Sequence, residues 1–159
     1  MIWAAIFGHE QSDAVLLERD FESKKHGYSS RSYIKVLENI PSCWEPGRIY
    51  MQDNAKIHKS HATMKWFRDN GIDLLEFPPY SPDLNPIEQL WFHLKELVNI
   101  LDPELRDFKA GEEELRERLT SAVQRAWLCI SPERIRALVE SMDTRINAVI
   151  EAEGWYTRF

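Results

Sequence analysis

The sequence predicts an α/β fold in which strands and helices alternate at first and helices alone follow. Short apolar runs bounded by turn residues, such as 48–53 and 72–77, are typical of strands. Apolar residues from residue 87 onward recur at the three- and four-residue spacing of amphipathic helices. A hydrophobic fraction of 43%, with six Trp, seven Phe and five Tyr, indicates a packed interior. We therefore expect one domain that spans residues 1–159.

The elements before residue 78 mix both kinds of secondary structure, because turn residues interrupt each apolar run. The sequence predicts, in order, a hairpin of 1–8 and 14–17 across a polar turn at 10–13, a helix from Ser29 that stops before Pro41, a strand over 48–53, a helix over 60–70 followed by Gly71 as its cap, and a strand over 72–77.

The remaining elements are all helical. The predicted helices cover 87–98, 112–128 and 132–152, with a connection over 102–111. We expect the apolar stripes of the last two helices to face the core: Leu115, Leu119, Ala122, Val123 and Ala126 in one, and Ile135, Leu138, Val139, Met142 and Ile146 in the other.

The net charge of −6 is the wrong sign for a protein that binds nucleic acid by general phosphate neutralisation. Any binding of DNA therefore has to come from a local group of residues or from another chain segment. Cys43 and Cys129 lie far apart with no CxxC pattern, which predicts neither a zinc site nor a disulfide framework. The sequence shows no secretory signal and no apolar run of membrane-spanning length. We expect a soluble, intracellular protein with no membrane partner.

Two carboxylates lie at predicted element ends, where the backbone can aim them into one cleft. Asp53 ends the strand over 48–53, and Glu88 lies in the first turn of the helix over 87–98. Carboxylate oxygens are the ligands that Mg²⁺ prefers, and paired carboxylates can hold two ions roughly 3.5–4 Å apart for phosphoryl transfer.

Each carboxylate also has a purely structural interpretation. Asn85, Pro86 and Glu88 fit a helix cap, with Asn85 at the N-cap and Glu88 bonding to backbone N–H groups. Asp53 and the following Asn54 fit a turn, and Asp83 fits a type I turn without catalytic duty. Spacing alone leaves both interpretations open.

Two segments carry a longer literal pattern, with 34 residues between their acids. They are Asp53-Asn54-Ala55 with His58, and Pro78-Pro79-Tyr80-Ser81-Pro82-Asp83-Leu84-Asn85-Pro86-Ile87-Glu88 with Trp91. Their sequences resemble the signature segments of mariner-type DDE transposases of the Tc/mariner superfamily. Residues 1–6 resemble the strand that follows the family's first catalytic strand, and residues 154–159 resemble its C-terminal end. The resemblance thus extends over nearly the whole chain.

This resemblance implies an RNase H-like mixed sheet flanked by helices, with the C-terminal helices after it. It implies Asp53 and Glu88 as the second and third metal-binding catalytic residues, Mg²⁺ or Mn²⁺ as the cofactor, and Asn54 and His58 at the rim of the site. DNA is the implied partner, with a homodimer possible and a nuclear location in a eukaryote. Asn54 and His58 are candidate DNA contacts. So are the basic residues that gather around the Asp53 signature segment, Lys56, Lys59, Lys65 and Arg68, for which a solvated helix face is the equal alternative. In the family the first carboxylate lies on a strand upstream of the one that residues 1–6 resemble, so we expect an incomplete site, weak metal binding and no cleavage.

Two other functions fit the same residues. The first is a repurposed, non-enzymatic domain that binds nucleic acid or protein, and the second is a degenerate transposon remnant. His58 and His61 do not predict a zinc site, because no Cys or third His follows at ligand spacing.

Overall fold

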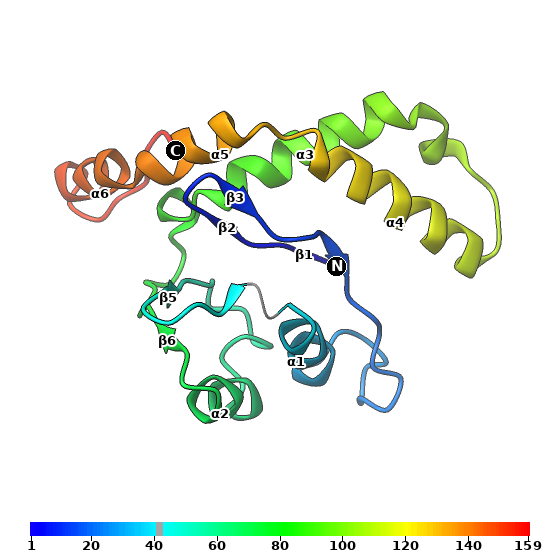
Figure 1. Cartoon of the computed structure of the whole chain (residues 1–159), viewed down its shortest axis with the longest axis horizontal. Coiled ribbons are helices and arrows are strands. Elements are labelled where there is room, and N and C mark those ends of the chain that lie inside the picture. The colour runs from blue at the N-terminus through cyan, green and yellow to red at the C-terminus, as the bar shows by residue number, and fades with distance from the viewer. Residues whose placement is uncertain (41–42) are drawn as a thin grey trace. The chain divides into compact units, whose positions relative to one another are not determined.

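The computed structural model describes residues 1–40 and 43–159, and its backbone contacts divide the chain into two compact units (Figure 1). Unit 1 comprises Met1–Trp3 and Leu16–Ser81, and unit 2 comprises Ala4–Val15 and Pro82–Phe159. Helices and strands mix in the first, and helices dominate the second, as the sequence predicts. No helix in the described part of the chain is long and apolar enough to cross a membrane.

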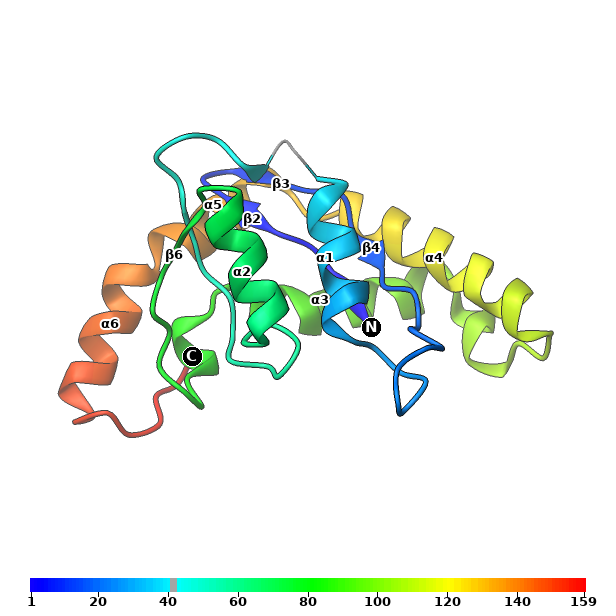
Figure 2. The ribbon, with the colours of Figure 1, turned by 90° about the horizontal axis from the view of Figure 1, so that it is seen from below.

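Unit 1 packs two helices beside a short parallel strand pair. Helices α1 (Ser30–Glu38) and α2 (His61–Asp69) lie side by side in both ribbon views (Figures 1 and 2). Strands β5 (Ile49–Tyr50) and β6 (Asp73–Leu74) pair in parallel. The core side chains of this unit are almost fully buried: Leu17, Tyr33, Leu37 and Phe67. Strand β1 (Ile2–Trp3) is paired with β4 (Val15–Leu16).

The starts of α1 and α2 and the end of α2 are where the sequence predicts them. Ser29 caps α1 in a capping box with Ser32, and Ser60 caps α2 through Thr63. Gly71 follows α2 with a φ of 64°, and its N–H donates to the Arg68 carbonyl at 3.1 Å in a Schellman arrangement. Glycine suits this left-handed position because it has no Cβ. The predicted helix stop at Pro41 lies outside the described residues.

The strands are shorter than predicted. β5 ends at Tyr50, not at Asp53, because the last backbone bond of the pair joins the Leu75 N–H to the Tyr50 carbonyl at 2.9 Å. Beyond it, the Gln52 side chain bonds to Tyr33 and to the His58 carbonyl, which draws the chain away from β6. The prediction that Asp53 ends a strand is therefore wrong by three residues.

Unit 2 begins with a hairpin whose turn is tighter than predicted. Strands β2 (Ile6–Phe7) and β3 (Glu10–Gln11) pair in antiparallel register. Gly8, with a φ of 61°, starts the connection, so the predicted turn at 10–13 is wrong. A two-residue link that allows positive φ is the preferred hairpin turn.

The helices of unit 2 begin with a 3-10 turn and an antiparallel pair. The 3-10 turn η2 (Pro82–Leu84) leads into α3 (Ile87–Leu101). A second 3-10 turn, η3 (Pro103–Asp107), joins α3 to α4 (Glu112–Leu128), and the two helices pack together (Figure 1). Trp91 of α3 stacks on Trp127 of α4 at 5.6 Å between ring centroids. The Trp127 indole N–H also donates to the Ser12 carbonyl at 2.7 Å, which ties the hairpin to the helices.

The last predicted helix is two helices, α5 (Pro132–Glu140) and α6 (Met142–Glu151). Ser141 interrupts them: its hydroxyl donates to the Leu138 carbonyl at 2.6 Å and competes with the helical backbone. The stripe expectation is partly wrong, because Ile146 is 44% exposed while Arg145 is buried. Leu115, at the start of α4, is likewise exposed.

Candidate active site

Asp53 lies just after β5, in a turn that its own side chain stabilises. Its Oδ1 accepts the backbone N–H of Ala55 at 3.0 Å, the hydrogen bond of an Asx turn. The side chain is 52% exposed. The turn interpretation and the site interpretation are therefore compatible, because the turn uses one oxygen and leaves the carboxylate at the surface.

His58 is the second group that holds Asp53. Its Nδ1 lies 2.5 Å from Asp53 Oδ1, and its ring packs against Tyr33 at 4.4 Å between centroids. The His58 side chain is only 19% exposed. Within residues 1–40 and 43–159, the hydrogen bonds to the Asp53 carboxylate all reach Oδ1, so Oδ2 carries none.

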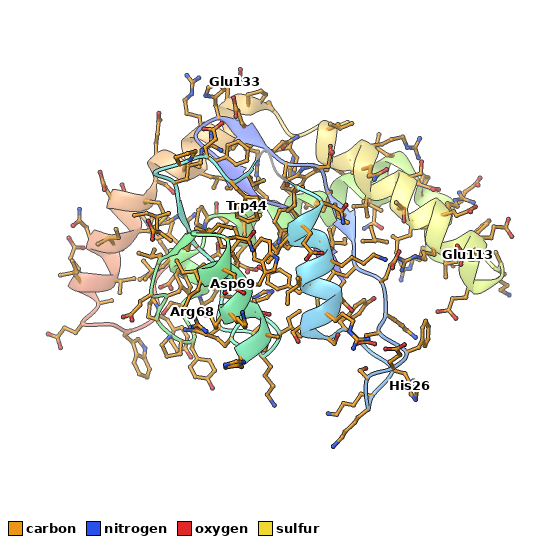
Figure 3. All side chains as sticks on the ribbon, turned by 60° about the horizontal axis from the view of Figure 1, so that its bottom comes forward. His26, Trp44, Arg68, Asp69, Glu113 and Glu133 are labelled. Carbon is orange, nitrogen blue, oxygen red and sulfur yellow. The ribbon has the colours of Figure 1, made fainter. Side chains whose placement is uncertain are left out.

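Tyr33 links this turn to the core of unit 1. Its hydroxyl donates to Gln52 Oε1 at 2.7 Å and lies 3.1 Å from the Tyr50 hydroxyl. Burial raises the pKa of Tyr33 far above its usual value, so the hydroxyl stays protonated and keeps its donor. Trp44 lies between α1 and α2 in Figure 3, and its indole N–H donates to the Leu37 carbonyl at 3.1 Å.

The other residues predicted for DNA contact surround Asp53 in sequence. The Asn54 amide donates to the Phe77 carbonyl at 2.8 Å and so ties the turn to the segment after β6. Lys56 and Lys59 are exposed. On α2, Lys65 pairs with Asp69 at 2.5 Å, and Figure 3 shows Asp69 beside Arg68 near the end of that helix.

Glu88 lies in the first turn of α3 and is exposed. The Asn85 amide donates to Glu88 Oε1 at 3.4 Å, and the Glu88 N–H donates to the Asn85 carbonyl at 3.1 Å. The helix begins at Ile87, as predicted, with Pro86 as the N-cap and no side-chain cap bond from it. The prediction of Asn85 as N-cap is wrong, because its side chain reaches the Glu88 carboxylate instead.

Asp83, predicted as a turn residue without catalytic duty, is buried and anchors the segment before Glu88. Its Oδ2 accepts the Thr157 hydroxyl at 3.0 Å, and its backbone carbonyl accepts Arg145 Nη1 at 2.6 Å. Neither Arg145 nor Thr157 is predicted by the motifs or the apolar spacing of the sequence. The available signal was a charged residue beside Ile146 in the last apolar stripe, but nothing in the spacing pairs it with Asp83, 62 residues away.

The two candidate ligands suit a hard cation by their chemistry, since both are exposed carboxylates. Asp53 belongs to unit 1 and Glu88 to unit 2, so their sharing of one ion remains a prediction. Among the described residues, no group of three or more His, Cys, Asp or Glu side chains could hold a metal ion.

Comparison with known protein families bears directly on these two residues. Residues 19–110 match the family described as DDE superfamily endonuclease, and this stretch covers more than half of the chain and includes Asp53 and Glu88. The chain belongs to the DDE endonuclease superfamily. The family predicted from the two signature segments is thereby confirmed.

Curated transposases are similar to most of this chain. Identity is 34% over 132 residues with the transposable element Tcb1 transposase of Caenorhabditis briggsae, covering 80% of this chain and 45% of that protein. It is 34% over 113 residues with the Tc1 transposase of Caenorhabditis elegans, covering 71% and 38%, and 33% over 162 residues with the Tc3 transposase of that organism, covering 97% and 44%. The chain thus spans less than half the length of these relatives.

A solved structure shows the same fold. The crystal structure of the catalytic domain of Mos1 mariner transposase matches with a TM-score of 0.58 at 18% identity, covering 82% of this chain and 64% of that one. The predicted RNase H-like α/β fold is confirmed by this likeness.

Proposed function

We propose that this chain supplies Asp53 and Glu88 as the second and third metal-binding carboxylates of a transposase catalytic domain that cuts and joins DNA. The observation that carries the proposal is the way Asp53 is held. Ala55 and His58 fix one carboxylate oxygen and leave the other without a hydrogen bond in the described structure. A surface carboxylate fixed through one oxygen is pre-ordered to bind a cation through the other.

The residues of the chain orient the two ligands. His58 and the Ala55 N–H limit the rotation of Asp53, while the Asn85 amide restrains Glu88 from one side. When bound, Mg²⁺ or Mn²⁺ activates the attacking oxygen and stabilises the leaving one in phosphoryl transfer. DNA ends and target DNA are the proposed substrates, and the exposed Lys56 and Lys59 beside Asp53 are the proposed phosphate contacts. A dimeric assembly on DNA and a nuclear location in a eukaryote belong to the same proposal.

The residues of this chain supply two of the family's three carboxylates, which predicts no cleavage by the 159-residue chain alone. We expect a version extended upstream by the Asp-bearing strand of a relative to nick supercoiled plasmid in Mg²⁺ or Mn²⁺. D53N and E88Q should each abolish that nicking. E140Q, an exposed glutamate on α5, is the matched control and should leave it unchanged.

Two outcomes would contradict the proposal. Metal-dependent nicking by the 159-residue chain, lost in E88Q, would show that another side chain replaces the first carboxylate. An extended version that binds DNA but never nicks it, with E88Q and D53N unchanged in binding, would favour the repurposed, non-enzymatic function instead.

A further inference from the structure

Resting on the proposed role of Glu88, we propose that Arg145, Thr157 and Phe159 are positioning residues for it. They lie on α6 and in the segment after it, far from Glu88 in sequence, yet they hold the loop over 82–88 that delivers Glu88 to the start of α3. All of these contacts lie within unit 2.

Arg145 is the buried part of this support. Its side chain is among the largest fully buried ones, with a relative exposure of 1%. Nη1 donates to the Asp83 carbonyl at 2.6 Å and Nε donates to the Ser141 hydroxyl at 2.8 Å, while the Phe159 ring lies 4.7 Å from the guanidinium carbon. A buried cation is costly unless its donors are used. The bond to Ser141 fixes the guanidinium, and the bond to the Asp83 carbonyl then constrains where Asp83 can lie.

Thr157 holds the side chain of the same residue. Its hydroxyl donates to Asp83 Oδ2 at 3.0 Å, and the Phe159 N–H donates to Thr157 Oγ1 at 3.4 Å. The other carboxylate oxygen, Asp83 Oδ1, accepts the backbone N–H of the adjacent Leu84 at 3.2 Å. Backbone and side chain of Asp83 are thus both anchored to the last stretch of the chain.

The loop passes this constraint on to Glu88 because it is short and stiff. Prolines at 82 and 86 fix φ at both ends. The Asn85 N–H donates to the Pro82 carbonyl at 3.0 Å, and the Glu88 N–H donates to the Asn85 carbonyl at 3.1 Å. A displacement of Asp83 therefore moves the start of α3 rather than being absorbed in between.

Core packing alone does not call for these residue types. An aliphatic side chain at 145 would fill space between α6 and η2 but would leave the Asp83 carbonyl unpaired. Likewise, valine has the shape of Thr157 without a donor for Asp83 Oδ2. The polar atoms of both residues hydrogen-bond to Asp83, and this shared partner is the observation that assigns them a positioning role in addition to packing.

Hydrogen exchange of the backbone amides at 83–85 and 87–89 tests the positioning directly in the 159-residue chain. We expect T157V to speed exchange at these amides about fivefold, as for the loss of one hydrogen bond to a carboxylate, with α4 amides unchanged. T157S restores the hydroxyl and should restore protection. T144V, an exposed threonine on α6, is the matched control. Equal exchange in T157V and wild type would overturn the proposal.

Manganese broadening of the same amide resonances links positioning to the metal role. In the wild type we expect broadening at 84–89 that E88Q removes, and we expect T157V to need about threefold more Mn²⁺ for equal broadening, with rescue by T157S. If E88Q removes the broadening while T157V leaves it unchanged, the positioning role is contradicted and the proposed function stands. No E88Q-sensitive broadening would count against the proposed function, and the exchange result would then decide the positioning by itself.

Discussion

The Asp53 and Glu88 segments are held in opposite ways. Asp53 is exposed and depends on near neighbours in sequence, since Ala55 and His58 provide its bonds. The segment before Glu88 is anchored through the buried Asp83 by partners 62 and 74 residues away. The comparison shows that two residues of one proposed site can differ in whether their support is local or comes from the far end of the chain.

The largest expected effect is on the distant support. R145M removes a buried guanidinium and leaves the Asp83 carbonyl and the Ser141 hydroxyl without its donors. We expect a loss of about 2–4 kcal/mol in the free energy of unfolding, at about 1–2 kcal/mol for each group left unsatisfied. Urea titration measures it, and R136M on the exposed face of α5 should change little. A loss no larger than that of R136M would remove the contrast between the two segments.

A matched pair of aspartates sharpens the comparison. D83A should cost about 1–3 kcal/mol, because Asp83 is buried and the partly buried Thr157 hydroxyl loses its acceptor. D53A should cost about 1 kcal/mol or less, because its carboxylate is exposed and its contact with His58 is a surface pair. The same urea titrations give both values. Equal costs would mean that local and distant supports contribute alike to stability.

The smallest expected effect is on the acid dependence of stability, at the other end of α3. Asp102 accepts two bonds from the Arg118 guanidinium, at 2.8 and 2.5 Å, and these hold the pKa of Asp102 below its usual value of 3.8. The folded-state pKa is lowered, so the stabilisation is complete above about pH 4 and is lost as the pH falls through the lowered value. We expect D102N to flatten the fall in unfolding midpoint between pH 5 and about pH 2. An unchanged slope would show that this bridge does not contribute.

Local signals made much of the fold predictable from the sequence. Capping serines at 29 and 60 and the glycine at 71 act within a few residues, and the predicted helices begin or end close to them. The literal match around Asp53 and Glu88 identified the family in the same way. Such features are read correctly because their physical cause lies inside a short window of sequence.

What could not be predicted depends on contacts between distant residues. The strand over 48–53 ends early because Gln52 bonds to Tyr33. The helix over 132–152 breaks at Ser141, whose hydroxyl donates to the Leu138 carbonyl and accepts a hydrogen bond from Arg145 Nε. Arg145 occupies a buried position that periodicity gives to Ile146, because Asp83 supplies it with an acceptor. Amphipathic spacing reports hydrophobicity and carries no information about such a partner.

The bond between Thr157 and Asp83 bears on how copies of such a gene should be judged. A reading frame closed just before codon 157 would still encode both signature segments with every acidic residue in place. On the positioning that we propose, its product would nevertheless lack the hydroxyl and the aromatic ring that steady the loop before Glu88. Counting catalytic motifs in genomic copies would therefore overestimate the number whose product holds this loop in place, and codons 157 to 159 belong in that inspection.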